Sequence, residues 1–162
     1  MKTVLCILSM LLISCGSTQT ATEKGEMSQV QQWAKDKQFT IESNYANPLR
    51  GNQISLIGNT NYLTVNKEHV SAYLPFYGQR QIGNVLKGGA IEFEGTPKDV
   101  QLIYNQRKKS SIISFTISEK GENYQVTVTL YDNKNSRITV NSSQRDLMRY
   151  EGEVEALPED EK

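Results

Sequence analysis

The stretch Ser110–Leu130, SSIISFTISEKGENYQVTVTL, decides the fold class of this chain. Every second side chain on either side of its polar centre is apolar: Ile113, Phe115, Ile117, then Tyr124, Val126, Val128 and Leu130. A period of two residues is typical of a β-strand with one buried face. The centre, Glu119–Asn123, has the composition of a turn. The stretch therefore predicts two antiparallel strands joined by a tight connection.

The same rhythm extends in both directions along the chain. Further strands are predicted at Phe39–Tyr45, Ile54–Ile57, Tyr62–Val65, Val70–Tyr77, Ala90–Glu94, Val100–Tyr104, Ile138–Val140 and Leu147–Val154. The polar connections between them are short, so consecutive strands must pair antiparallel, which excludes a parallel βαβ architecture. We predict an all-β fold, an antiparallel meander that forms a small barrel or a sandwich.

One helix is predicted, at the start of the folded domain. In Met27–Lys37, the residues Met27, Val30 and Ala34 share a helical stripe, and Ser28 is a suitable N-cap. We place a single domain at residues 27–155 and an acidic, disordered tail at residues 156–162.

The N-terminus has the pattern of an export signal. Lys2 precedes an apolar run, Val4–Ile13, that is too short to span a bilayer. Leu12-Ile13-Ser14-Cys15 resembles the bacterial lipobox, in which a small residue precedes the cysteine that receives a diacylglycerol. We predict a signal peptide at residues 1–14, lipid attachment at Cys15, and a flexible tether at residues 15–26.

The lipid would make a membrane the first partner of this protein. Cys6 leaves with the signal and Cys15 is consumed by the lipid, so the mature chain is predicted to have no disulfide. The residue directly after Cys15 is Gly16. An aspartate at that position would favour retention in the inner membrane of some bacteria. We therefore predict an envelope location, at the periplasmic face of the outer membrane.

The sequence offers little material for catalysis or for metal binding. The 18 basic and 18 acidic residues balance, which argues against nucleic acid as a partner. His69 is the only histidine, so no metal site, cofactor or catalytic residue is predicted. Glu92 and Glu94 are two residues apart, as expected for the solvent-facing side of a strand. Arg107–Lys109 is interpreted as the exposed, solubilising tip of a loop.

The segment Tyr73-Leu74-Pro75-Phe76-Tyr77-Gly78 does not follow simple alternation. Pro75 lacks a ladder donor, so we expect it at a sheet edge or a bulge, and Gly78 permits a sharp bend. One interpretation is a kinked strand whose aromatic side chains fill the core. The other is that Tyr73, Phe76 and Tyr77 line a hydrophobic cleft or a partner surface.

The same segment carries a family resemblance. Together with the helix, Phe39–Ile41, Pro48-Leu49, Asn61–Val65, Ile91–Phe93 and a closing stretch at Arg145–Gly152, it resembles domain of unknown function 4251, a family of Gram-negative lipoproteins and secreted proteins. The family's pattern has arginine directly after the glycine. Here Gln79 precedes Arg80, so no role is carried over to that arginine. The resemblance implies an all-β fold in the bacterial envelope and implies no activity.

Three functions follow as hypotheses. The first is a non-enzymatic lipoprotein that binds a small ligand or an envelope protein. The second is a hydrolase of envelope or periplasmic sugars, which would need two inward carboxylates about 5–10 Å apart. The third is a structural assembly partner with a flat apolar patch. A cavity lined by the aromatic side chains of Tyr73–Tyr77 would favour the first.

Overall fold

The structure is a computed structural model that describes residues 27–81 and 89–158. Its elements are one helix and ten strands: α1 (Gln29–Asp36), β1 (Gln38–Pro48), β2 (Ile54–Ser55), β3 (Tyr62–Asn66), β4 (His69–Pro75), β5 (Ala90–Gly95), β6 (Lys98–Asn105), β7 (Ser110–Glu119), β8 (Glu122–Tyr131), β9 (Asn135–Ser142) and β10 (Met148–Ala156). Every strand predicted from the sequence is present. The predicted signal peptide, the tether and Cys15 lie outside the described residues.

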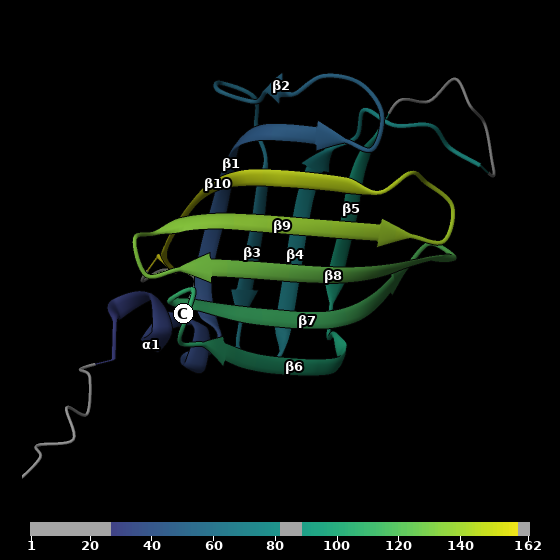
Figure 1. Cartoon of the computed structure of the whole chain (residues 1–162). Helices are drawn as coiled ribbons and strands as arrows, with labels where there is room; N and C mark the ends of the chain where they lie inside the picture. The colour runs from purple at the N-terminus through teal and green to yellow at the C-terminus, as the bar shows by residue number, and fades with distance from the viewer. Residues whose placement is uncertain (1–26, 82–88, 159–162) are drawn as a thin grey trace, which may run out of the picture.

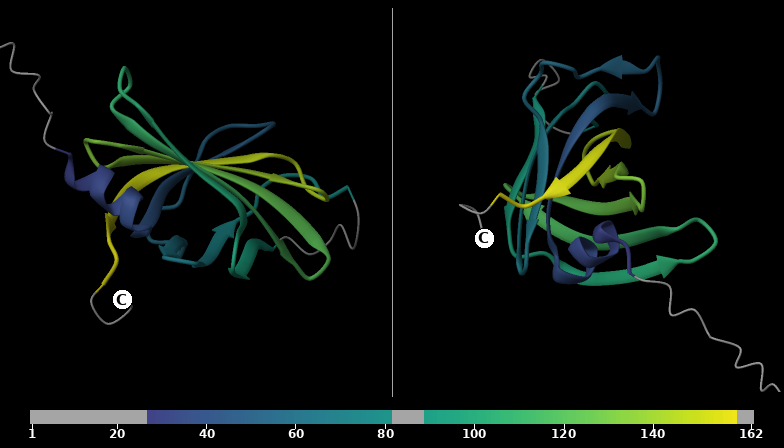
Figure 2. Two further views of the ribbon diagram at one scale, coloured as in Figure 1. Left: turned by 90° about the horizontal axis from the view of Figure 1, so that it is seen from below. Right: turned by 90° about the vertical axis from the view of Figure 1, so that its left-hand side faces the viewer.

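All ten strands belong to one antiparallel sheet. Its order is β5-β4-β3-β1-β10-β9-β8-β7-β6, with β2 paired to β1 off this path. In Figure 1, β6–β10 run across the front, and β3–β5 run behind them at a steep angle. The two further views in Figure 2 show how the sheet curls over itself into a half-barrel. The predicted all-β antiparallel class is confirmed.

The core fills the space between the two arms of the curled sheet. Phe93 of β5 meets Phe115 of β7 edge-on, with ring centroids 6.3 Å apart. Its other neighbour is Tyr124 of β8, at 5.4 Å. Such contacts between aromatic rings stabilise the fold beyond the contribution from burying their apolar surface. Strands far apart in the sheet order are therefore joined by side chains across the interior.

The helix α1 is attached to the end of the half-barrel. Ser28 caps it as predicted, because its side chain accepts a hydrogen bond from the Gln31 N–H at 3.1 Å. The Ser28 hydroxyl also donates to Asp132, which lies just after β8, at 2.9 Å. Val30 and Ala34 are buried, and Trp33 packs against the core. Among the described residues, no helix is long and apolar enough to cross a membrane.

A β-bulge lies where the sheet turns from one arm into the other. Along the β1–β10 pair, Ser43 faces Gly152 and Tyr45 faces Glu151, so Asn44 is an extra residue on β1. Before the bulge, β1 pairs with β3, and after it β1 pairs with β2. The bulge thus marks the corner at which β1 passes between two sets of neighbours.

A buried side chain completes the hydrogen bonding at this corner. Asn61, which precedes β3, accepts from the Ser43 N–H at 2.8 Å and donates to the Ser43 carbonyl at 2.9 Å. The amide of Asn61 therefore takes the place of a neighbouring strand backbone. If the Asn61 side chain were removed, the buried backbone N–H and carbonyl of Ser43 would lose these hydrogen bonds, at a cost of about 1–3 kcal/mol each.

Two sequence-based expectations differ from the structure. β10 continues to Ala156 and Leu157 is buried, so the folded part extends beyond the predicted boundary at residue 155. Pro75 lies neither on an edge strand of the sheet nor at a bulge. It is the last residue of β4, an inner strand. β3 pairs with β4 only as far as Tyr73, so β4 lacks that neighbour at Pro75.

Candidate functional site

The segment Tyr73–Gly78 divides its side chains between the core and the surface. Leu74 and Phe76 are buried, whereas Tyr73 and Tyr77 are exposed. The Pro75 carbonyl accepts a hydrogen bond from the hydroxyl of the buried Tyr150 at 2.9 Å. Burial raises the pKa of Tyr150, so this hydroxyl keeps its proton and remains a donor. The end of β4 is therefore fixed from inside.

Three tyrosines form an exposed aromatic surface, which we call the tyrosine face: Tyr62, Tyr73 and Tyr77. Tyr62 of β3 lies directly opposite Tyr73 of β4, and Tyr77 follows the end of β4. Their exposed fractions are 40%, 37% and 42%, so each ring presents part of its surface to solvent.

The tyrosine face borders an open hollow of about 520 Å³. The hollow is lined by Asn59, Thr60, Tyr62, Tyr73, Pro75 and Tyr77, and none of these described residues carries a formal charge. Glu92 of β5 lies beside Tyr73 in the sheet register and is exposed. The site therefore combines aromatic rings and neutral polar groups with a carboxylate at its margin.

Phe76 does not belong to this surface. It was one of the three candidate binding residues from the sequence, but it is 9% exposed and packs in the core. Its ring faces the Arg145 guanidinium at 5.3 Å, within the range of a cation–π contact. A Cβ on Gly78 would approach the Phe76 ring to 2.8 Å, so glycine is required here because the ring occupies the space.

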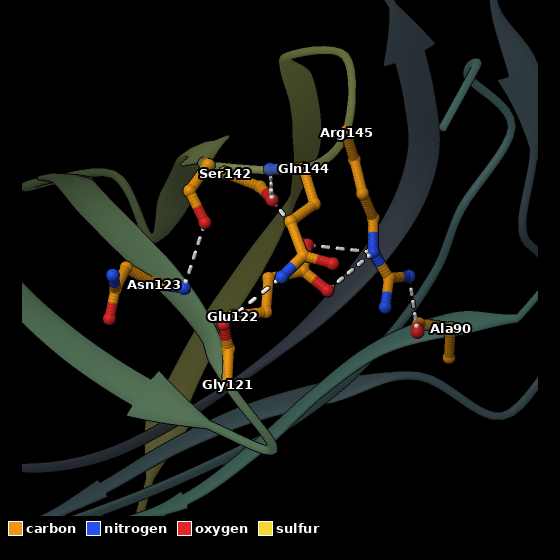
Figure 3. Close-up of polar contacts among 8 residues, drawn as sticks. Ala90, Gly121, Glu122, Asn123, Ser142, Gln144 and Arg145 are labelled. Carbon is orange, nitrogen blue, oxygen red and sulfur yellow. Dashed lines mark hydrogen bonds and ion pairs between the residues drawn. The ribbon is translucent and has the colours of Figure 1, made fainter. Parts of the chain in front are cut away.

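A buried polar group, which we call the Arg145 cluster, lies next to Phe76, and its contacts are drawn in Figure 3. It consists of Glu122, Ser142, Gln144 and Arg145. The Arg145 Nε donates to both carboxylate oxygens of Glu122, at 2.8 and 3.0 Å. A second guanidinium nitrogen donates to the Ala90 carbonyl at 2.8 Å. Both charged side chains are less than 10% exposed. One arginine thus joins β5, β8 and the loop before β10.

The surroundings of Glu122 keep it ionised. Burial alone would raise its pKa, but hydrogen bonds from Arg145 and Ser142, with the Arg145 charge, outweigh burial and lower the pKa. Burial raises the pKa of the neighbouring Tyr124 to about 12, and the charge of Glu122 adds to this rise. A general acid needs a raised carboxyl pKa, and Glu122 has the opposite. The cluster has the character of a structural ion pair.

The remaining residues singled out in the sequence belong to neither group, although Glu92 lies at the margin of the tyrosine face. His69 begins β4, is exposed, and has its Nε2 3.3 Å from a Glu94 carboxylate oxygen. Glu92 and Glu94 face solvent as predicted, and Arg107–Lys109 form the exposed turn between β6 and β7. Within the part of the chain that the structure describes, no three His, Cys, Asp or Glu side chains gather in a group able to hold a metal ion.

Two functional candidates were missed by sequence reasoning. Tyr62 precedes the buried Leu63 on β3, so alternation places it outward, but its pairing with Tyr73 depends on the sheet register. Arg145 and Glu122 are 23 residues apart in a loop and a strand end. The sequence around Tyr62, and around Arg145 and Glu122, contains no local signal that predicts which residue each of them contacts.

These features define a class: a single-sheet antiparallel half-barrel with one capping helix, a buried arginine–glutamate pair and an outer aromatic surface. The profile of one protein family, Domain of unknown function (DUF4251), matches residues 21–154. The chain therefore belongs to the DUF4251 family, as the resemblance around Pro75 indicated.

Comparison with known proteins adds one solved structure of interest. This is the crystal structure of a DUF4251 family protein from Bacteroides eggerthii DSM 20697, determined at 1.95 Å resolution. It shares 24% sequence identity, with a TM-score of 0.59, over 79% of this chain and 84% of that chain. This likeness shows the fold. Among curated proteins, no match was found.

Proposed function

We propose that this chain is a lipid-anchored envelope protein whose domain binds a neutral, hydroxyl-rich ligand, a saccharide chain, on the tyrosine face. The observation that carries the proposal is the hollow of about 520 Å³ bordered by three half-exposed tyrosines and lined by uncharged residues. Aromatic rings combined with a few polar groups are typical of ligand sites. The anchor rests on the lipobox sequence that ends at Cys15.

The chemistry of the face favours a saccharide over a charged ligand. A pyranose ring has an apolar side made of C–H groups, which packs on a tyrosine ring, and a rim of hydroxyls that needs polar partners. Asn59 and Thr60 supply such partners beside the rings. Glu92 at the margin accepts hydrogen bonds from hydroxyls and repels anions.

The described residues offer no pair of buried carboxylates for the alternative of a sugar hydrolase. In the described part of the chain, Glu122 is the one acidic residue that is buried, and Arg145 binds both of its oxygens. Its lowered pKa removes it as a proton donor at neutral pH. A non-enzymatic binding role for the domain therefore has the better support.

Tyr73→Ala is expected to weaken saccharide binding about tenfold or more, because a central aromatic side chain usually contributes most of a site's affinity. The measurement is isothermal titration calorimetry of the full chain with a panel of neutral malto-, cello-, manno- and chito-oligosaccharides. Tyr45→Ala is the matched control, since Tyr45 on β1 is 39% exposed but does not border the hollow. Equal losses in both variants, or no binding to any of the panel, would overturn the proposal.

Cys15→Ala is expected to move the protein from the membrane fraction to the soluble envelope fraction, because the lipid is its anchor. Mass spectrometry of the protein purified from its native membranes should find a chain that begins at Cys15 and carries diacylglycerol. The matched control is Cys6→Ala, which leaves the lipobox cysteine in place. An intact Met1 together with an unmodified Cys15 would contradict the anchor.

A further inference from the structure

The two edges of the sheet differ in how they are protected. β5 forms one edge, and its exposed side carries Glu92 and Glu94, whose charges discourage pairing with another strand. β6 forms the other edge and exposes large apolar side chains. Leu102, Ile103 and Tyr104 are 44%, 58% and 39% exposed. Soluble proteins usually avoid an apolar edge of this kind unless it has a partner.

The apolar side chains of β6 lie on both of its faces. Leu102 pairs with the buried Ile113 of β7, so its side continues the core face of the sheet. Ile103 pairs with Ile112 and lies on the opposite face. A flat partner would cover one face only, whereas an added strand presents side chains to both. The geometry therefore fits a strand as the partner of this edge.

We propose that the strand is β6 of a second copy, paired antiparallel about Ile103. The regular pairing of β6 with β7 spans Gln101–Asn105, and Ile103 is its central residue. In this arrangement Ile103 of one copy faces Ile103 of the other. Leu102 of each copy faces Tyr104 of the other. Gln101 faces Asn105 of the second copy. Apolar residues thus meet apolar residues, and amides meet amides.

The charged residues near β6 do not define the register. Asp99 lies in the register irregularity near the start of β6, and Arg107 lies in the turn after β6, so neither belongs to the regular pairing. The basic turn Arg107–Lys109 is exposed. The register therefore rests on the five regularly paired residues of β6, Gln101–Asn105. A strand paired in this way joins two half-barrels into one continuous sheet.

Cross-linking tests the register directly. In the full chain with Cys6 and Cys15 replaced by serine, Ile103→Cys places the two thiols on the symmetry axis. Under mild oxidation it should form a disulfide dimer about tenfold faster than Glu92→Cys, the matched control on the β5 edge, because facing Cβ atoms on paired strands are close to disulfide distance. Tyr104→Cys should also be slow, since it faces Leu102 rather than itself.

Sedimentation equilibrium supplies an independent measurement. The full chain should show a concentration-dependent dimer, and Ile103→Lys should be monomeric throughout, because it places two charges against each other in the interface. Since Ile103 is 58% exposed, this variant should unfold at the same urea concentration as the unmodified chain when both are monomeric. A monomer at all concentrations, or equal cross-linking at residues 92 and 103, would overturn the proposal.

Discussion

Replacing Gly152 with alanine is expected to prevent stable folding or to cost about 4 kcal/mol or more, the range reached only by severe local defects. Gly152 faces Ser43 at the bulge in β1. A Cβ at this position would lie 2.5 Å from the Ser43 Cα and closer still to the Glu42 carbonyl oxygen. These are backbone atoms, so no side-chain rotation relieves the overlap, and the corner of the sheet would have to open.

Gly58→Ala is the matched control for this substitution. Gly58 has φ of +81°, which disfavours alanine, but a Cβ there meets nothing within 4 Å. Its cost should be about 1–2 kcal/mol, the penalty of a left-handed conformation alone. Urea unfolding followed by Trp33 fluorescence measures both variants. Similar losses of stability in the two would show that the close packing of β1 on β10 does not constrain residue 152.

The strands could be predicted because their signal is local. Every second residue is buried from Ile113 to Ile117 in β7 and from Glu122 to Leu130 in β8, as the two-residue period requires. The bulge could not be predicted, since it depends on which residue of β1 faces Gly152, and that residue, Ser43, is 109 positions away along the chain. Asn61 is a further example: its sequence context is that of a turn, but its side chain replaces a strand neighbour.

The candidate site was predicted in part, and the error has a local explanation. Alternation from the buried Leu74 places Phe76 inward and both Tyr73 and Tyr77 outward, and the structure follows this rule through Pro75. Grouping Phe76 with the tyrosines gave aromatic character more weight than this period. The third member of the tyrosine face, Tyr62, depends on a register that only the folded sheet defines.

Replacing Arg145 with methionine is expected to lower the free energy of unfolding at pH 7 by about 3–5 kcal/mol, because it leaves the buried Glu122 carboxylate without its cation. Arg137→Met is the matched control. Arg137 also lies 2.8 Å from a glutamate, Glu151, but this pair is 49% and 39% exposed. Loss of an exposed pair should cost less than about 1 kcal/mol. Equal costs for the two variants in urea unfolding at pH 7 would contradict a buried pair.

The pH dependence separates a lost charge partner from lost packing. In the unmodified protein the folded-state pKa of Glu122 is lowered, so its contribution to stability is present above the ordinary carboxyl pKa and is lost as pH falls through the folded value. In Arg145→Met, the hydrogen bond and the charge of Arg145 no longer lower the pKa of Glu122, and burial raises it against the remaining hydrogen bonds from Ser142 and Tyr124, so protonation at falling pH removes the penalty. The gap in stability, meaning the difference in unfolding free energy between the unmodified protein and Arg145→Met, should therefore be widest at pH 7. It should narrow steadily between about pH 5 and pH 3.

Adding Glu122→Gln to Arg145→Met should restore part of the lost stability at pH 7, because a neutral amide replaces the unpaired charge. The stability gap of this double variant should narrow less at low pH than that of Arg145→Met, because only the Glu122 of the unmodified protein still titrates. If Arg145 acts only by packing against Phe76, the gap will instead stay constant with pH and the second substitution will restore nothing. Urea unfolding at several pH values distinguishes these outcomes, since the charge model requires both the narrowing and the recovery.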